Sequence, residues 1–327
     1  MRRLMLLVVA VVVASLAFTA VSSGESTART PMLVYASVRS VEESDEPDDP
    51  NIVGDLFLLR PDGRGLRRIT TTAWHETDPA WSPDGRRIAF SRGSPFFNAG
   101  AWQTVFPAAI FVIDGSGKNL RPVTNTLSAR EGPSLIDSSP TWSPDGQLIA
   151  FAREDQMGDT PPGIYVVGAD GKGLRRVATR HALSVDWSPD GASLAFVAST
   201  VESWSAGRVG LIDLQTGTVK EFRLSGALDV SWSPDGRTLA VVGERGITLM
   251  APTGRVVRQM ATGGNTSSSL PATRPGISWS PAGRQLAYSA VAKGRRNSDI
   301  FIVAADGQGT KRITGSPGSD FAPDWRP

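Results

Sequence analysis

The stretch Ser139-Pro-Thr-Trp142-Ser-Pro-Asp-Gly146, followed by Ile149-Ala-Phe151, decides the fold because the same pattern returns along the chain. Its tryptophan recurs at Trp81, Trp142, Trp187, Trp232, Trp279 and Trp325. Trp142, Trp187 and Trp232 are 45 residues apart, and the first interval, of 61 residues, carries an insertion. A fixed period in this range predicts a repeat architecture in which neighbouring units bury a shared core.

A second set of short segments fills the interval between copies. They are rich in β-branched and aromatic residues, as in Ala109-Ile-Phe-Val-Ile-Asp114, and most run into a glycine-bearing turn and a segment such as Arg67-Arg-Ile-Thr70. In Ser-Pro-Asp-Gly, proline presets φ and glycine supplies the positive φ of a type I turn with a bulge. Each unit is therefore predicted to hold four antiparallel strands, which is typical of a β-propeller blade.

The two ends of the repeat region complement each other. Residues 32–70 supply three strands, Met32–Ala36, Asp55–Arg60 and Leu66–Thr70, whereas the chain ends on a Trp strand, Asp320–Pro327, that has no partners of its own. We therefore predict an all-β, six-bladed β-propeller of four-stranded antiparallel blades over residues 32–327. The C-terminal Trp strand joins the N-terminal strands and closes the ring, which removes an exposed sheet edge.

Residues 1–22 are interpreted as a targeting segment. Arg2 and Arg3 precede an apolar run from Leu4 to Val21, and small residues at Ala20 and Ser22 fit cleavage after Ser22. An uncleaved N-terminal anchor is the alternative, since about 18 apolar residues is the lower limit for a membrane span. In both cases we expect residues 23–31 to be a linker, the propeller to lie outside the cytoplasm, and membrane contact to be confined to residues 4–21.

The composition narrows the choice of partners. The chain has 34 Lys and Arg against 32 Asp and Glu and no polybasic tract, so we expect no nucleic-acid partner. It has no cysteine, so its stability rests on core burial without disulfides, and no cysteine is available for lipid attachment. We expect a monomer.

The cycle of Trp-Ser-Pro-Asp-Gly, Ile-Ala-Phe, Ile-Phe-Val and Arg-Ile-Thr resembles the repeat of the TolB propeller, which is shared with the propellers attached to prolyl oligopeptidases. The resemblance covers residues 32–327 and is specific for fold rather than for function. TolB carries an α/β domain before its propeller. Because the first strand here begins soon after the expected cleavage site, we expect that domain to be absent, and TolB's envelope role through its partner lipoprotein is not carried over.

The sequence offers little catalytic chemistry. It has two histidines, His75 and His181, and none of the HExxH, GxxxxGK or G-x-S-x-G patterns. Gly115-Ser-Gly-Lys118 is interpreted as a hairpin turn between the third and fourth strands of a blade. We therefore predict no catalytic residue, no metal and no cofactor.

The repeat tryptophans are interpreted as core residues, because each blade needs a bulky side chain in the wedge against its neighbour. An aromatic cage for a ligand is the alternative. Trp74, Trp102 and Trp204 stand outside the repeat in expected loops, where they either anchor the loop or contact a ligand or partner.

Length variation is concentrated in the loops that join blades and in those between second and third strands, which are expected at one end of the propeller. We call this the loop-rich end and place the binding face there, since loops on a rigid scaffold usually carry recognition. Five residues before the repeat tryptophan stand Glu76, Asp137 and Asp320 in three neighbouring blades, and Arg274 beside Asp320.

We expect these carboxylates to converge at the pore mouth. His75 and His181 each lie one residue earlier in their repeats. A carboxylate cluster could hold a cation or a basic group of a partner, and solvated rim residues are the alternative. The insertion in the first interval carries Phe96, Phe97, Trp102 and Phe106. These aromatics either plug the pore mouth or form an exposed contact site for a partner.

The leading hypothesis is a non-catalytic, extracytoplasmic propeller that binds a protein or peptide through its loop-rich end. The alternative is a carbohydrate- or small-molecule-acting enzyme, a hydrolase or lyase, with a pore-mouth site built on Glu76, Asp137 and the histidines. A stoichiometric metal ion that is lost on mutating Asp137 would favour the enzyme.

Overall fold

The computed structural model describes residues 31–39, 53–93, 108–125, 135–155, 160–200, 203–224, 226–266 and 275–327. The chain divides into two units, Met1–Thr30 and Pro31–Pro327, and the fold below is that of the second. Its described residues form strands and no helix, so the all-β prediction is confirmed. Within these residues, accordingly, no helix is present that is long and apolar enough to cross a membrane. The expected targeting segment lies outside the described residues.

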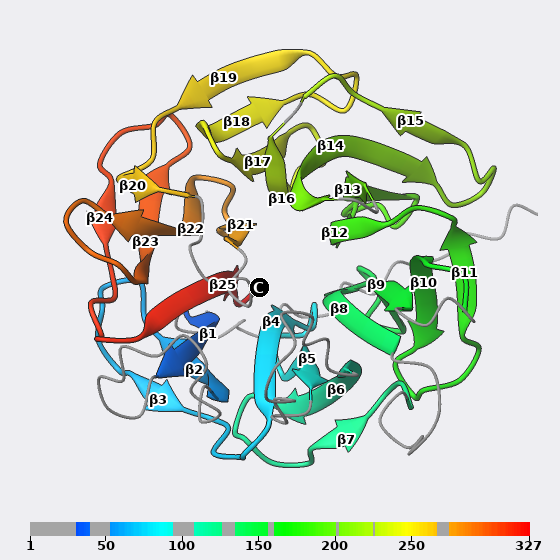
Figure 1. The fold of residues 1–327 in the computed structure, drawn as a ribbon, viewed down its shortest axis with the longest axis horizontal. Helices are drawn as coiled ribbons and strands as arrows, with labels where there is room; N and C mark the ends of the chain where they lie inside the picture. The colour runs from blue at the N-terminus through cyan, green and yellow to red at the C-terminus, as the bar shows by residue number, and fades with distance from the viewer. Residues whose placement is uncertain are drawn as a thin grey trace, which may run out of the picture. The chain divides into compact units, whose positions relative to one another are not determined.

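The strands form four-stranded antiparallel meanders around a common centre, each running from an innermost strand with a repeat tryptophan to an outermost strand (Figure 1). The meanders that are continuous in sequence are β4 (His75–Trp81), β5 (Arg87–Gly93), β6 (Ala108–Asp114) and β7 (Arg121–Pro122); β8 (Leu135–Trp142), β9 (Leu148–Asp155), β10 (Gly163–Gly168) and β11 (Arg175–Ala178); β12 (Ala182–Trp187), β13 (Ser193–Thr200), β14 (Ser203–Asp213) and β15 (Val219–Glu221); β16 (Ala227–Trp232), β17 (Leu239–Gly243), β18 (Gly246–Met250) and β19 (Val256–Met260); and β21 (Ile277–Trp279), β22 (Gln285–Ala292), β23 (Ser298–Ala304) and β24 (Lys311–Arg312), with β20 (Gly264–Asn265) also paired to β22.

The remaining meander combines the two ends of the chain. Its order is β25 (Ser319–Trp325), β1 (Leu33–Arg39), β2 (Val53–Leu59) and β3 (Arg67–Arg68). β25 runs antiparallel to β1, with Trp325 opposite Leu33 and Asp320 opposite Ser37. The C-terminal and N-terminal strands therefore share one sheet.

The innermost strands are bulged just before the tryptophan. The ladder of β4 shifts between Thr77 and Ala80, and that of β8 shifts between Ser138 and Thr141. Asp78, Ser139 and Ala322 have φ of 50°, 52° and 49°, and each precedes a proline. A bulge leaves residues outside the ladder, so their polar groups are free to bond to the neighbouring meander.

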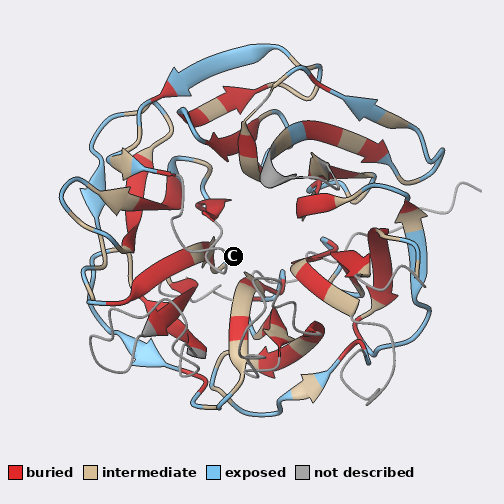
Figure 2. Cartoon of the chain, in the orientation of Figure 1, coloured by how far each residue is buried: buried red, intermediate tan, exposed pale blue. Residues whose placement is uncertain are grey.

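The core lies between adjacent meanders. Figure 2 shows the central strands mainly buried and the outermost strands largely exposed. One apolar cluster joins Val34 of β1 and Leu56 of β2 to Trp81 of β4 and Phe90 of β5, and each of these side chains is at most 5% exposed. Such packing of one sheet face against the next is what the fixed period in the sequence predicts.

Two details differ from the sequence-based expectations. The outermost strand expected at Leu66–Thr70 is reduced to β3, Arg67–Arg68. The loop expected at 199–207 is instead part of the β13–β14 hairpin, in which Thr200 pairs with Ser203, so Trp204 stands in a strand.

Candidate functional site

Glu76 lies near the start of the innermost strand β4 and is fully buried. Arg92 Nε of β5 is 3.5 Å from Glu76 Oε1, and Thr72 Oγ1 donates a hydrogen bond to the same oxygen. Burial raises the pKa of Glu76 to about 7, while the Thr72 hydrogen bond and the Arg92 charge act in the opposite direction. Oε2 is buried without a hydrogen-bond partner among the described residues. A carboxyl group that exchanges its proton near neutral pH has the property of a general acid.

Asp137 occupies the equivalent place in β8 and is also fully buried. Arg153 of β9 donates two parallel hydrogen bonds to it, from Nε to Oδ1 at 2.6 Å and from Nη2 to Oδ2 at 2.7 Å. Burial pushes the pKa of Asp137 up, and the hydrogen bonds and charge of Arg153 oppose that change. In this bidentate geometry, the guanidinium of Arg153 binds both carboxylate oxygens of Asp137.

The cross-strand register explains which repeats carry an acid at this place. The register partners are Glu76–Arg92, Asp137–Arg153, Ala182–Ala198 and Ala227–Gly243. In these pairs the acid and the arginine occur together or not at all, as expected of cross-strand ion pairs. The sequence contained this signal, because both arginines follow the repeat tryptophan at the same distance.

Asp320 belongs to β25 and is 1% exposed. Ser316 Oγ donates to it, at 3.3 Å from Oδ1 and 3.1 Å from Oδ2. The neighbouring carboxylate of Asp299 pairs with Arg295 at 3.3 Å and with Arg312 at 3.6 Å. Burial raises the pKa of Asp299, the two arginines lower it, and the charge of Asp320 adds to the increase. Arginine therefore offsets negative charge in this region as well.

The two histidines have different partners. His75 Nδ1 accepts a hydrogen bond from the backbone N–H of Gly54 at 2.9 Å, and burial lowers the pKa of His75 to about 4, so this ring is neutral at neutral pH. His181 Nδ1 lies 2.6 Å from Glu154 Oε2, and its side chain is 30% exposed. Each histidine is thus held by a neighbour other than the three predicted carboxylates.

Among the described residues, each predicted site side chain has a partner outside the predicted set. Glu76 and Asp137 are each paired with an arginine, and Asp320 accepts from a serine. Nowhere in the described part of the chain are three or more His, Cys, Asp or Glu side chains placed to hold a metal ion. The other predicted binding residues, Arg274, Phe96, Phe97, Trp102 and Phe106, lie outside the described residues.

The repeat tryptophans lie between strands, where Trp81, Trp142, Trp187, Trp279 and Trp325 are buried and Trp232 is partly buried. Trp81 is 5% exposed and Trp279 is 8% exposed. Trp142 Nε1 donates to the Ala80 carbonyl of the neighbouring meander at 3.2 Å, and the Arg326 guanidinium lies 5.2 Å from the centroid of the Trp81 ring. These rings bridge adjacent meanders and leave little surface for a ligand.

Sequence reasoning missed a second acidic set, which we call the inner aspartates. They are Asp78, Asp186, Asp229 and Asp324, on the innermost strands. Each accepts a backbone N–H of a neighbouring innermost strand, and the bonds are Ser139 N to Asp78 at 3.2 Å, Trp232 N to Asp186 at 2.6 Å, Ile277 N to Asp229 at 2.7 Å and Trp81 N to Asp324 at 2.7 Å. Asp186 also accepts from Thr141 Oγ1 at 3.0 Å, and Asp324 from Ser278 Oγ at 2.8 Å.

Burial raises the pKa of Asp186 to about 7 and those of Asp229 and Asp324 to about 6. Their hydrogen bonds act in the opposite direction, and the charges of Asp324 and Asp229 raise the pKa of Asp186 further. These carboxyl groups satisfy backbone donors that the bulged strands would otherwise leave unpaired. The available signal was an Asp, Ser or Thr one or three residues before the tryptophan in every repeat.

Comparisons with known proteins agree with this fold. No protein-family model matches the chain. The Tol-Pal system protein TolB of Nitratidesulfovibrio vulgaris is 49% identical over 37 residues, which are 11% of this chain and 8% of that relative. TolB of Rhizorhabdus wittichii is 31% identical over 90 residues, or 28% of this chain and 17% of that relative. The chain thus matches less than a fifth of the length of these curated relatives.

Solved structures extend the likeness to most of the chain. TolB from Acinetobacter baumannii has a TM-score of 0.65 and 19% identity, covering 90% of this chain and 66% of that one. An oligogalacturonate lyase in complex with manganese has a TM-score of 0.51 and 15% identity, covering 76% of this chain and 71% of that one. At these identities the likeness concerns fold, and the resemblance to a TolB-like propeller is confirmed at that level.

Proposed function

We propose that this chain is an exported, six-bladed propeller of the TolB type that binds a protein or peptide partner at its loop-rich end and does not catalyse a reaction. Residues 1–22 direct export, so the propeller over residues 32–327 works outside the cytoplasm. The exported protein is a monomer. Within the part of the chain that the structure describes, the decisive support is that Glu76 and Asp137 are buried and that each is paired with an arginine of the chain itself.

Closure of the ring is supported by the hydrogen bonds of the innermost strands. Side chains link β4 to β8, β8 to β12, β12 to β16, β16 to β21, β21 to β25, and β25 back to β4. The register of β25 on β1 supplies the last sheet from both ends of the chain. Six blades joined in this way provide a rigid base for variable loops.

The binding experiment uses the loop aromatics. Purified wild-type protein is coupled to resin and challenged with an envelope extract of its own organism, beside the double variant Phe97→Ser and Trp102→Ser. The control is Lys118→Ser, an exposed residue in the β6–β7 turn. We expect saturable capture of a protein by the wild type and the control, and its loss in the double variant at an unchanged melting temperature.

Other outcomes count against the proposal. Equal capture by all three proteins would remove the contact-site role of the aromatics. A double variant that melts several degrees lower would identify Phe97 and Trp102 as a plug over the pore mouth, because truncating buried rings costs a few kcal/mol. If no protein is captured saturably by the wild type, the binding function itself is refuted.

A second candidate function rests on Glu76. A hydrolase or lyase acting on a carbohydrate or small molecule needs a group that exchanges a proton near neutral pH, and burial gives Glu76 that property. The fold likeness to an oligogalacturonate lyase makes oligogalacturonate the first substrate to test. Formation of an unsaturated product is followed by absorbance, with and without Mn²⁺, for the wild type and Glu76→Gln. Product that disappears in the variant would establish the enzyme, and no product from the wild type would remove this candidate.

A further inference from the structure

The outermost strands touch the next meander in a regular way. Each carries a basic residue at one register position, namely Arg67, Arg121, Arg175, Lys220, Arg258 and Lys311. Most of these side chains donate to a backbone carbonyl in the third-to-fourth-strand turn of the next meander, and the bonds are Arg67 to Ser116 O at 3.2 Å, Arg121 to Ala169 O at 2.7 Å, Lys220 to Thr253 O at 3.3 Å and Arg258 to Asp306 O at 2.9 Å.

The glycine of the same turn packs against the preceding outermost strand. A Cβ on Gly117 would stand 2.9 Å from the Ile69 carbonyl oxygen, and one on Gly171 would stand 3.1 Å from that of Val123. The basic side chain and the glycine together fill the gap between adjacent outer rims.

Between β11 and the β14–β15 turn, both contacts are missing. The side chain of Arg175 makes no hydrogen bond to any residue that the structure describes, and nothing lies within 4 Å of a Cβ built on Gly217. The cause is a turn that is one residue longer. Gly217 N donates to the carbonyl of Asp213, four residues back, whereas Gly117 N donates to that of Asp114, three residues back.

The longer turn is stabilised from within. The Asp213 carboxylate accepts hydrogen bonds from the backbone N–H groups of Gln215 and Thr216 and from Thr216 Oγ1, at 3.0, 2.8 and 2.9 Å. The β14–β15 turn is therefore held by its own hydrogen bonds without a contact to β11. Because it follows a different path from the shorter turns, the space beside β11 stays open.

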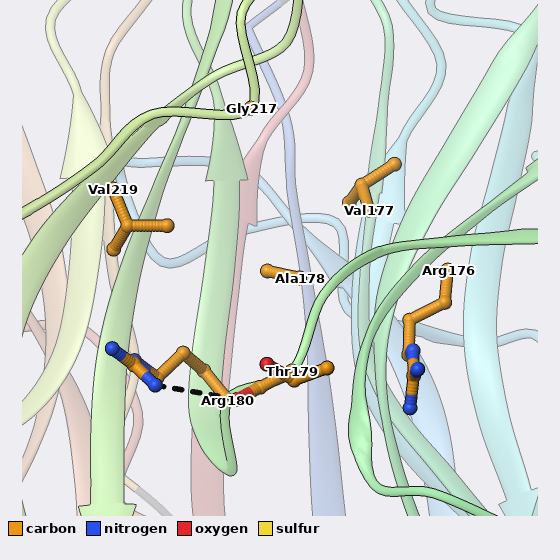
Figure 3. Close-up of a pocket in the computed structure, with 7 residues that line it drawn as sticks. All are labelled: Arg176, Val177, Ala178, Thr179, Arg180, Gly217 and Val219. Carbon is orange, nitrogen blue, oxygen red and sulfur yellow. Dashed lines mark hydrogen bonds between the residues drawn. The ribbon is translucent and has the colours of Figure 1, made fainter.

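This open junction is a groove of about 340 Å³, within the size range of ligand sites. Figure 3 shows the guanidinium groups of Arg176 and Arg180 on opposite sides of it, with Ala178 between them and Val219 on the facing strand. Arg180 Nε pairs with Glu221 at 3.1 Å, while the guanidinium of Arg176 forms no ion pair or hydrogen bond with the described residues. The groove therefore combines an excess of positive charge with a few apolar side chains, Val177, Ala178 and Val219.

We propose that this groove is a second binding site, which accepts an extended acidic peptide segment of a partner protein. At four other junctions a backbone carbonyl of the neighbouring turn accepts a hydrogen bond from the basic side chain of the outer strand, and an extended peptide supplies carbonyls of that kind. An extended acidic segment in the groove brings carboxylates within reach of the guanidinium groups of Arg176 and Arg180 and small apolar groups close to Ala178 and Val219. The site lies on the outer rim and does not depend on the loop-rich end or on the partner proposed there.

The test measures fluorescence anisotropy of a labelled peptide that alternates glutamate and valine, titrated with the full-length protein. The matching lysine–valine peptide is the charge control. We expect the acidic peptide to bind the wild type, with Arg176→Glu weakening binding about tenfold or more by reversing charge at the site. Lys311→Glu is the charge control, because it makes the same change of charge on another outermost strand, β24, one position before the equivalent of Arg176.

A second variant tests the groove without changing charge. Val219→Trp fills the groove and is expected to weaken binding as strongly as Arg176→Glu, while circular dichroism confirms that both variants fold. Equal losses in Arg176→Glu and Lys311→Glu, with Val219→Trp unaffected, would show attraction to the basic rim in general and overturn the proposal. Equal binding of the lysine–valine peptide, or no binding of the acidic peptide to the wild type, would overturn it as well. None of these outcomes bears on capture by the loop aromatics.

Discussion

Glu76 and Asp137 occupy the same place in neighbouring meanders, yet their chemistry differs because their arginines meet them differently. Arg153 contacts both oxygens of Asp137, at 2.6 and 2.7 Å, which compensates the cost of burying the charge. Arg92 reaches Glu76 at 3.5 Å from one nitrogen, and its guanidinium also lies over the rings of Trp74 and Phe111. Burial raises the pKa of both carboxyl groups, and that of Glu76 reaches about 7 with this weaker compensation.

This difference predicts a pH effect on stability. The pKa of Glu76 rises from its ordinary 4.5 to about 7 on folding, so the folded protein holds this proton more tightly than the unfolded chain does. The stability that the group contributes is full below about pH 4.5 and is lost as pH rises toward 7. Glu76→Gln keeps the shape of the protonated side chain but cannot ionise. As the pH rises from about 5 to about 8, the free energy of unfolding of the variant is therefore expected to increase by roughly 3 kcal/mol relative to that of the wild type.

Urea unfolding at these two pH values measures the gain. Glu244→Gln, which changes an exposed glutamate, is the control and should keep the pH dependence of the wild type. If Glu76→Gln also keeps that dependence, Glu76 ionises normally in the folded protein, and the second candidate function loses its general acid.

At the residue scale, the sequence predicted where the acidic side chains stand but not what they meet. Alignment on the tryptophans located Glu76 and Asp137, and the structure supplied Arg92 and Arg153 from the adjacent strand. Finding those partners needs the strand register, which the bulge before each tryptophan shifts. The same bulge hid the inner aspartates, because a regular strand would have bonded the backbone N–H groups that they accept.

At the element scale, threonine hydroxyl groups accept hydrogen bonds that longer outermost strands would accept. The backbone N–H groups of Leu56, Ile110 and Ile300 donate to the hydroxyl oxygens of Thr70, Thr124 and Thr314, each at 2.9 Å. The threonine hydroxyl thus accepts the hydrogen bond that a backbone carbonyl would accept in a longer ladder, while the Thr124 N–H still donates to the Ile110 carbonyl at 3.2 Å. This explains why the outer strands are shorter than the sequence pattern predicted, since propensity gives no information on side-chain substitution for a ladder bond.

The threonine bonds can be tested individually. Thr124→Val keeps the side-chain volume and leaves the buried N–H of Ile110 without its acceptor, so we expect a loss of about 1 to 3 kcal/mol in the free energy of unfolding. Thr253→Val, at an exposed turn position, is the matched control and should change stability by less than about 0.5 kcal/mol. Comparable effects of the two substitutions in urea unfolding would mean that the hydroxyl of Thr124 contributes nothing specific.

At the scale of the whole molecule, the repeat period predicted most of the architecture. The period and the turn chemistry predicted antiparallel strands in units of about 45 residues, and the pairing of β25 with β1 matches the complementarity of the chain ends. The β11 groove could not be predicted, because it follows from one added residue in a turn and from the path of that turn against a neighbouring strand. A sequence repeat predicts the contact that recurs between neighbouring meanders, whereas a junction that differs from the others is recognised only in the three-dimensional structure.

The terminal strand provides the last test, because a chain with no cysteine has no disulfide to hold its two ends together. Deleting Asp320–Pro327 removes the partner of β1 and the Asp324 carboxylate that holds Trp81 N and Ser278 Oγ. We expect the truncated protein to melt at a markedly lower temperature and to aggregate through the exposed edge of β1. A synthetic peptide of residues 319–327, added in excess, should restore part of the melting temperature by pairing in trans, and a scrambled peptide should not. A truncated protein that stays monomeric and melts with the wild type would show that β25 does not close the ring.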